Sequence, residues 1–87
     1  MNPLNYTNIS TGTTTVVKSG KGNLARIVIN TTAAGAVTIY DNTSAAGTKI
    51  ATFPSSAVVG YYEYGCKFNT GLTVVTAAAS DITVIWE

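Results

Sequence analysis

Histidine is absent from this 87-residue chain, cysteine occurs once, and only five basic and four acidic residues are present. Without histidine, no Ser-His or Cys-His nucleophile can be built, and Cys66 has no partner for an internal disulfide. Asp41 and Glu63 lie on different predicted strands, and Asp81 and Glu87 stand at opposite ends of a third. Their spacing brings no two of the four carboxylates together as a catalytic pair. We therefore expect no enzyme, no metal site and no cofactor, and we interpret Cys66 as a buried, unreactive thiol.

Long hydrophobic runs and a strong net charge are also missing. No apolar run is longer than three residues, so we predict no membrane-spanning segment. Residues 1–10 contain no Lys or Arg, which a secretory signal would require. The net charge of +1 provides no basic field for nucleic acid. We expect a soluble protein that is made in a cytoplasm and binds neither nucleic acid nor a membrane.

Residue types that favour β-strands and turns dominate what remains, since Thr, Val, Ile, Gly and Asn are abundant and Leu is scarce. We predict seven short strands, at residues 13–18, 23–31, 36–41, 48–53, 59–68, 72–76 and 81–87. The loop at 42–47 is a hairpin candidate. No segment has the period of an amphipathic helix, so the pattern indicates an antiparallel sandwich or a small barrel rather than βαβ units. Our prediction is an all-β fold, an antiparallel β-sandwich or jelly-roll-like domain.

Side-chain alternation indicates which residues face the core. In 59–68, one face receives Tyr62, Tyr64, Cys66 and Phe68, and the opposite face receives Tyr61, Glu63, Gly65 and Lys67. In 23–31, one face receives Ala25, Ile27 and Ile29, and the other receives Leu24, Arg26, Val28 and Asn30. The predicted core consists of Ile27, Ile29, Val37, Ile39, Tyr64, Phe68, Leu72, Val84 and Trp86.

Residues 1–12 differ from the rest and are predicted to form an extended N-terminal arm, followed by one β-sandwich domain over 13–87. The arm is polar, contains Pro3, and has isolated apolar residues at Leu4, Tyr6 and Ile9. Those three side chains fit either a frayed terminus or an anchor on a neighbouring molecule. Together with Tyr61, the aromatic residue predicted to be exposed, they are the candidate interface residues.

Several stretches of the chain resemble a family of small β-rich proteins from tailed bacteriophages and prophages. The stretches are VVKSG at 16–20, LARIVIN at 24–30, TIYDNTSAAGTKIA at 38–51, GLTVV at 71–75 and DITV at 81–84, together with Tyr64 and Phe68. The resemblance covers most of the chain from Thr15 onward. Residues 1–12 and 61–63 lie outside it, and we expect partner contacts to differ there.

The resemblance implies a structural component of the virion without enzymatic activity, a capsid decoration or cement protein on the outside of the shell. Its partner would be the major capsid protein, and by analogy with decoration proteins of this size it would form a homo-oligomer, with a trimer favoured. Synthesis would take place in the host cytoplasm. The alternative is a receptor-binding or adhesin module of a tail or head fibre that recognises a cell-surface glycan or protein.

Overall fold

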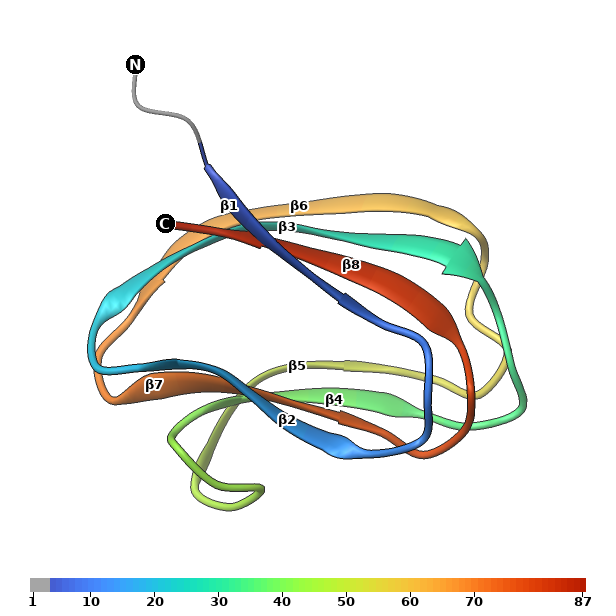
Figure 1. The fold of residues 1–87 in the computed structure, drawn as a ribbon, viewed down its shortest axis with the longest axis horizontal. Helices are drawn as coiled ribbons and strands as arrows, with labels where there is room; N and C mark the ends of the chain where they lie inside the picture. The colour runs from blue at the N-terminus through green and yellow to red at the C-terminus, as the bar shows by residue number, and fades with distance from the viewer. Residues whose placement is uncertain (1–3) are drawn as a thin grey trace.

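The computed structural model describes residues 4–87, which form eight β-strands and no helix. The strands are β1 (Asn5–Ile9), β2 (Thr14–Ser19), β3 (Gly22–Thr31), β4 (Val37–Asp41), β5 (Thr48–Phe53), β6 (Gly60–Phe68), β7 (Gly71–Thr76) and β8 (Asp81–Trp86). They make two four-stranded antiparallel sheets that face each other as a sandwich (Figure 1). The predicted all-β sandwich is confirmed, and the seven predicted strands agree with β2 to β8 to within one residue at each end.

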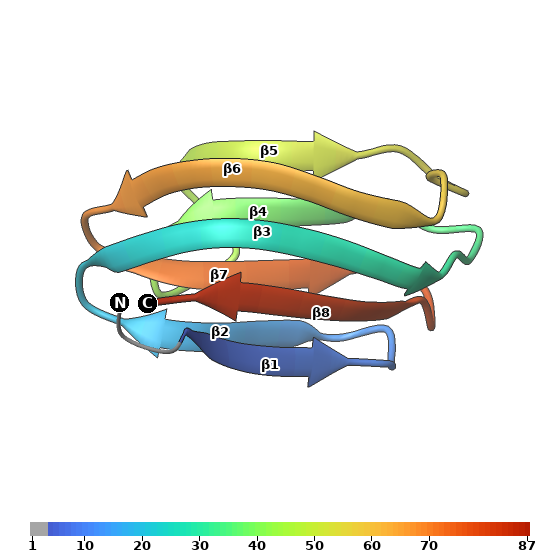
Figure 2. The ribbon, with the colours of Figure 1, turned by 90° about the horizontal axis from the view of Figure 1, so that it is seen from above.

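The strand order is β1-β8-β3-β6 in one sheet and β2-β7-β4-β5 in the other. We call them the β1/β6 sheet and the β2/β5 sheet, after their edge strands. Only the β4–β5 connection stays within one sheet, and every other connection crosses between the sheets. Figure 2 shows the two sheets from above, and the strand axes of one sheet are nearly aligned with those of the other. This is the eight-strand arrangement of a double-sheet jelly roll.

The β4–β5 connection is the hairpin that the sequence predicts, since β4 and β5 pair in antiparallel register. Its loop is held by the Asn42 side chain, whose Nδ2 donates to the Ala46 carbonyl at 2.8 Å and whose Oδ1 accepts from the Thr43 amide at 2.8 Å. The loop folds beneath the β2/β5 sheet (Figure 1), where Thr73 Oγ1 donates to the Asn42 carbonyl at 2.7 Å. The loop therefore covers part of the outer face of that sheet.

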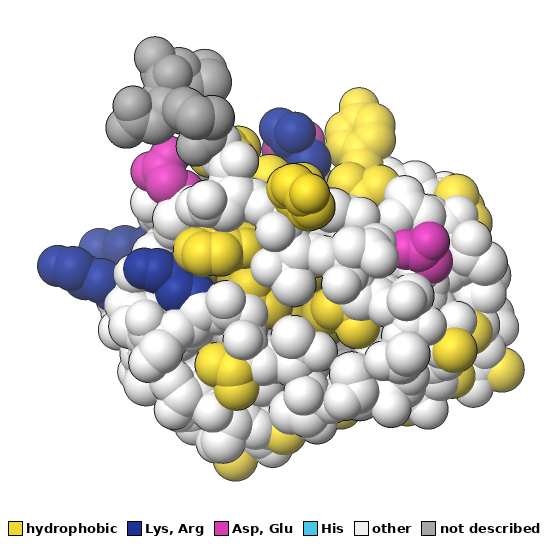
Figure 3. Space-filling view, viewed as in Figure 1, with side chains coloured by type: hydrophobic (Ala, Val, Ile, Leu, Met, Phe, Trp, Pro, Cys, Tyr) yellow, Lys and Arg dark blue, Asp and Glu magenta, His cyan; other side chains and the backbone are white. Residues whose placement is uncertain are grey.

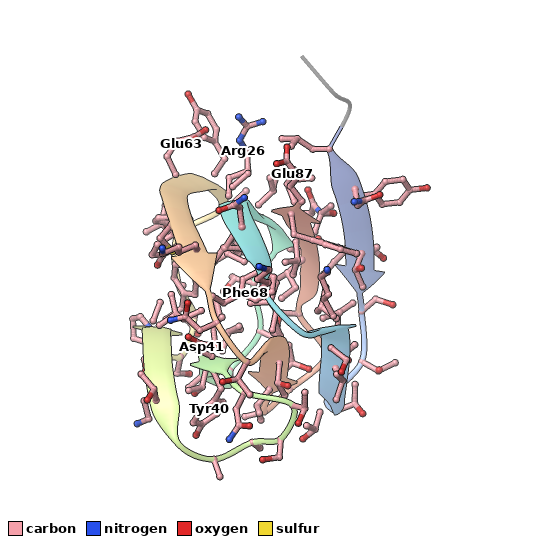
Figure 4. All side chains as sticks on the ribbon, turned by 90° about the vertical axis from the view of Figure 1, so that its left-hand side faces the viewer. Arg26, Tyr40, Asp41, Glu63, Phe68 and Glu87 are labelled. Atoms are coloured by element: carbon pink, nitrogen blue, oxygen red, sulfur yellow. The ribbon has the colours of Figure 1, made fainter. Side chains whose placement is uncertain are left out.

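The core lies between the two sheets and receives buried hydrophobic residues from every strand except β2. Its buried hydrophobic residues are Ile9, Leu24, Ile27, Ile29, Val37, Ile39, Phe53, Phe68, Leu72, Val74, Ile82 and Val84. The predicted core residues are all buried except Tyr64 and Trp86, which are half-buried and pack against the core. Phe68 lies between the sheets (Figure 4) and is fully buried. A Cβ at Gly22 would lie 2.6 Å from Phe68 Cζ, so this close approach requires glycine.

Strict alternation gives the wrong face for Leu24, which is fully buried and not on the outer face. The cause is a β-bulge between Leu24 and Arg26, where β3 has one more residue than β8. The extra residue shifts the alternation, so Leu24 and Ile27 both point inward. The pairing of β3 with β6 is irregular at the same level, where Gly65 adopts a left-handed conformation with φ of 57°.

The described part of the predicted arm is a strand of the sandwich. Residues 5–9 form β1, which pairs along its whole length with β8. Ile9 contributes to the core and is 4% exposed, so both interpretations of it, as part of a frayed terminus and as an anchor on a neighbouring molecule, are wrong. The segment was hard to recognise because an edge strand with few inward residues has little apolar content. Residues 1–3 of the predicted arm lie outside the described residues.

Candidate binding surface

The outer face of the β1/β6 sheet carries exposed aromatic residues at both of its edges. Tyr6 lies on the edge strand β1 and is 74% exposed, and Tyr61 lies on the opposite edge strand β6 and is 69% exposed. The other tyrosines are less accessible, because Tyr40, Tyr62 and Tyr64 are half-buried. Exposed tyrosines are typical of contact surfaces, since they offer a rigid apolar ring and a polar tip.

The strand register places the outward side chains of this sheet in two adjacent rows. The first row consists of Tyr6, Ile85, Arg26 and Glu63, and the second consists of Asn8, Thr83, Val28 and Tyr61. The two rows are separated by two residues along each strand, or about 6.6 Å. The half of the face at β6 therefore combines an aromatic ring, an aliphatic side chain and two opposite charges.

Arg26 and Glu63 form an ion pair across β3 and β6. Arg26 Nε donates to Glu63 Oε1 at 2.8 Å, and the two side chains are 42% and 57% exposed. Figure 4 shows both residues projecting from the outer side of the sheet, away from Phe68 and the core. With Val28 and Tyr61 they line an open surface depression of about 420 Å³. An exposed ion pair contributes at most about 1 kcal/mol to stability.

Next to this depression, hydrogen-bonded polar side chains from three strands form a network on the same face of the sheet. Asn8 Nδ2 donates to Asp81 Oδ1 at 2.7 Å, and it also lies within hydrogen-bond distance of Ile82 O and Thr83 Oγ1. Asn30 Nδ2 contacts Asp81 Oδ1 at 3.3 Å and Thr83 Oγ1 at 3.1 Å. The network joins β1, β8 and β3, and its polar side chains form hydrogen bonds to one another.

The candidate interface residues occupy three different environments. Leu4 is 38% exposed and precedes Tyr6 on the β1 side, whereas Ile9 is part of the core. Tyr61 is exposed, as predicted, but lies at the opposite edge. Leu4, Tyr6 and Tyr61 can contact another molecule, and the structure does not bring Tyr61 together with the other two.

The carboxylate of Asp41, at the end of β4, binds the backbone of the turn between β6 and β7. Its carboxylate accepts hydrogen bonds from the backbone amides of Asn69 and Thr70 at 3.0 and 2.8 Å, and a longer one from Gly71. These bonds, chiefly those from Thr70 and Asn69, hold the pKa of Asp41 below its ordinary value. The carboxylate therefore fixes the β6–β7 turn.

The remaining aromatic and sulfur side chains close the open sides of the sandwich. The Phe53 ring lies 4.9 Å from that of Tyr62 and 6.3 Å from that of Tyr64, which joins the β5 and β6 edges. Burial is the main cause that raises the pKa of Tyr64. Trp86 Nε1 donates to Thr7 Oγ1 at 3.2 Å. Cys66 is predicted to be a buried thiol, and the structure shows it half-buried on the edge strand β6.

Cationic side chains gather mainly at one end of the molecule, and a separate one lies over the β1/β6 sheet next to an apolar side chain (Figure 3).

Within residues 4–87, no three His, Cys, Asp or Glu side chains are placed to hold a metal ion. In the same part of the chain, no helix has the length and hydrophobicity needed to cross a bilayer.

No protein-family model matches the chain, and no curated protein matches it either. Among residues 4–87, the candidate functional surface is the outer face of the β1/β6 sheet, because Tyr6 and Tyr61 are exposed at its two edges. Sequence alternation identified the outward positions of Arg26, Val28, Tyr61 and Glu63. It could not show that these four side chains meet, because β3 and β6 are separated by two other strands along the chain.

Proposed function

We propose that this protein is a non-catalytic structural component of a bacteriophage virion. It binds the outside of the capsid shell, with the major capsid protein as its partner, and stabilises the shell by bridging neighbouring capsid subunits. The sequence resemblance supports this assignment, and the jelly-roll strand order is compatible with it, since viral capsid and lectin domains both use this architecture. The proposal places the protein at the capsid surface after synthesis in the host cytoplasm.

The observation that carries the proposal is the pair of exposed apolar residues Tyr6, on edge strand β1, and Leu4, directly before that strand. The outer side of an edge strand presents backbone groups that have no partner within the sheet, so another chain can pair there. Tyr6, with 74% of its surface exposed, lies on the outer face of the same strand. Apolar side chains beside an open strand edge form a surface on which a capsid segment can dock.

Attachment of this kind stabilises the assembled shell without any chemistry. A protein that binds the assembled state and not the separated subunits adds its binding free energy to assembly. A net charge of +1 allows many copies to sit close together with little mutual repulsion. Because attachment repeats over the whole shell, a small contribution from each copy is sufficient.

The test is cosedimentation of the full chain with purified shells that lack decoration. The Leu4→Ala/Tyr6→Ala double variant should bind these shells at least about tenfold more weakly than the unmodified protein. Val16→Ala is the matched control, because Val16 is also exposed but lies on edge strand β2 of the other sheet. It should bind normally.

Undiminished binding of the double variant would show that the β1 edge is not the attachment surface. If the unmodified protein does not bind shells, or if particles lacking it resist heat equally well, the decoration function itself is wrong. The adhesin alternative would then be favoured.

A further inference from the structure

We propose that the depression lined by Arg26, Val28, Tyr61 and Glu63 binds the ring of a neutral pyranose, as part of a carbohydrate. The site lies on the β6 half of the outer face, whereas Leu4 and Tyr6 lie on the β1 half. A protein attached through its β1 edge leaves this depression open. The inference does not depend on the proposed attachment to a shell.

The apolar part of the depression is formed by Tyr61 and Val28. They are direct partners in the register of β6 and β3, so the aliphatic side chain lies beside the aromatic ring. One face of many pyranoses presents mainly C–H groups, and such a face packs well against an aromatic ring. Tyr61 is accessible for this contact, because it is among the most exposed large apolar residues of the described chain.

The polar part is formed by Arg26 and Glu63, one row further along the same two strands. A guanidinium has five N–H donors, and the ion pair uses only Nε, at 2.8 Å from Glu63 Oε1. Among residues 4–87, no other hydrogen bond engages the Arg26 Nη groups or Glu63 Oε2. A donor and an acceptor therefore stand side by side at the rim of the depression.

This pairing matches the edge of a sugar ring. Each sugar hydroxyl both donates and accepts, so two adjacent hydroxyls can accept from Arg26 and donate to Glu63 at the same time. The ion pair brings Arg26 Nε and Glu63 Oε1 to 2.8 Å, and Arg26 lies on β3, an inner strand that is paired on both sides. Such preorganisation reduces the entropy lost on binding.

The charges of the site select a neutral ligand. The positive charge of Arg26 is balanced by Glu63, whose carboxylate would also repel a phosphate, a sulfate or an acidic sugar. A purely structural cross-strand pair would account for Arg26 and Glu63. The site differs from such a pair in that the Tyr61 ring and Val28 line the same depression and add an apolar surface to it.

The test is an NMR titration of the full 87-residue protein, with backbone amide shifts as the readout. The probes are the methyl pyranosides of glucose, galactose, mannose and N-acetylglucosamine, and the control is sorbitol, an open-chain polyol without a ring face. Saturable shifts centred on residues 26, 28, 61 and 63 with at least one pyranoside, and none with sorbitol, are expected. Dissociation constants on the order of millimolar are expected for so small a site.

Two tyrosine positions provide matched variants. Tyr61→Ala should weaken binding by about tenfold or more, whereas Tyr61→Phe, which keeps the ring, should retain it. Tyr6→Ala removes an equally exposed ring from the opposite edge of the same face and should leave binding unchanged.

The proposal is overturned if no pyranoside gives saturable shifts, if sorbitol gives the same shifts, or if Tyr6→Ala weakens binding as much as Tyr61→Ala. These outcomes are independent of cosedimentation with shells, where no sugar is present. Failure of one proposal is thus distinguishable from failure of the other.

Discussion

At the scale of single residues, Asp41 is the carboxylate with the clearest structural consequence. Its oxygens accept hydrogen bonds from the amides of the β6–β7 turn, and this lowers its pKa from the ordinary value of 3.8. Because the folded pKa is below the unfolded one, the resulting stabilisation is fully present above the unfolded value. It is lost as the pH falls through the folded pKa.

This linkage predicts a pH-dependent effect of Asp41→Asn. At about pH 7 the variant should have a lower free energy of unfolding than the unmodified protein, because a neutral amide accepts more weakly from the turn. The difference should shrink as the pH falls from the unfolded pKa through the lower folded pKa, because Asp41 is then protonated in both states. Urea unfolding of both proteins over a range of pH measures it. A stability difference that does not change with pH would contradict this account of Asp41.

At the scale of strands, alternation and turn residues predicted seven of the strands and most of the core. Tyr62, Tyr64 and Phe68 were placed on the correct face, because β6 keeps its period throughout. Leu24 was placed on the wrong face, because a bulge depends on the pairing of β3 with β8 and leaves no signal in β3 alone. The pairing of β3 with β6, and therefore the position of the depression, could not be predicted either. Local sequence patterns do not show which distant strands pair.

The strand that was missed, β1, provides a test of whether the segment belongs to the domain. Ile9→Ala should lower the free energy of unfolding by about 2–5 kcal/mol, since Ile9 is buried in the core. Tyr6→Ala on the same strand should change it by no more than about 0.5 kcal/mol, because Tyr6 is exposed. Urea unfolding measures both. Equal, negligible effects would show that β1 is a detachable arm in solution.

At the scale of the whole molecule, the two sheet faces differ in what they offer to other molecules. The outer face of the β2/β5 sheet is partly covered by the 42–47 loop, whereas the β1/β6 sheet exposes tyrosines at both edges. Polar networks and a single described ion pair occupy the space between those edges. Contacts with capsid, sugar or further copies are therefore expected on the β1/β6 side.

This asymmetry bears on the proposed self-association. We expect the isolated protein to form a homo-oligomer, with a trimer favoured, and sedimentation equilibrium at micromolar concentration measures its mass. The Tyr6→Ala variant should dissociate more readily if the β1 edge also contacts other copies. A compact monomer over the whole concentration range would exclude an oligomer free in solution and leave association to the shell surface.

The pairing of β1 with β8 also affects how the chain is made. The first strand of the sandwich has no neighbour within its sheet until the last one has been synthesised, and the β1/β6 sheet is joined through β8. Most pairings join strands that are far apart in sequence, which makes folding slow, on the order of milliseconds to seconds. A ribosome that stops before β8 would release a chain unable to close its core. Such a chain would lack the strand that joins β1 to β3, so a product truncated before β8 is not expected to fold.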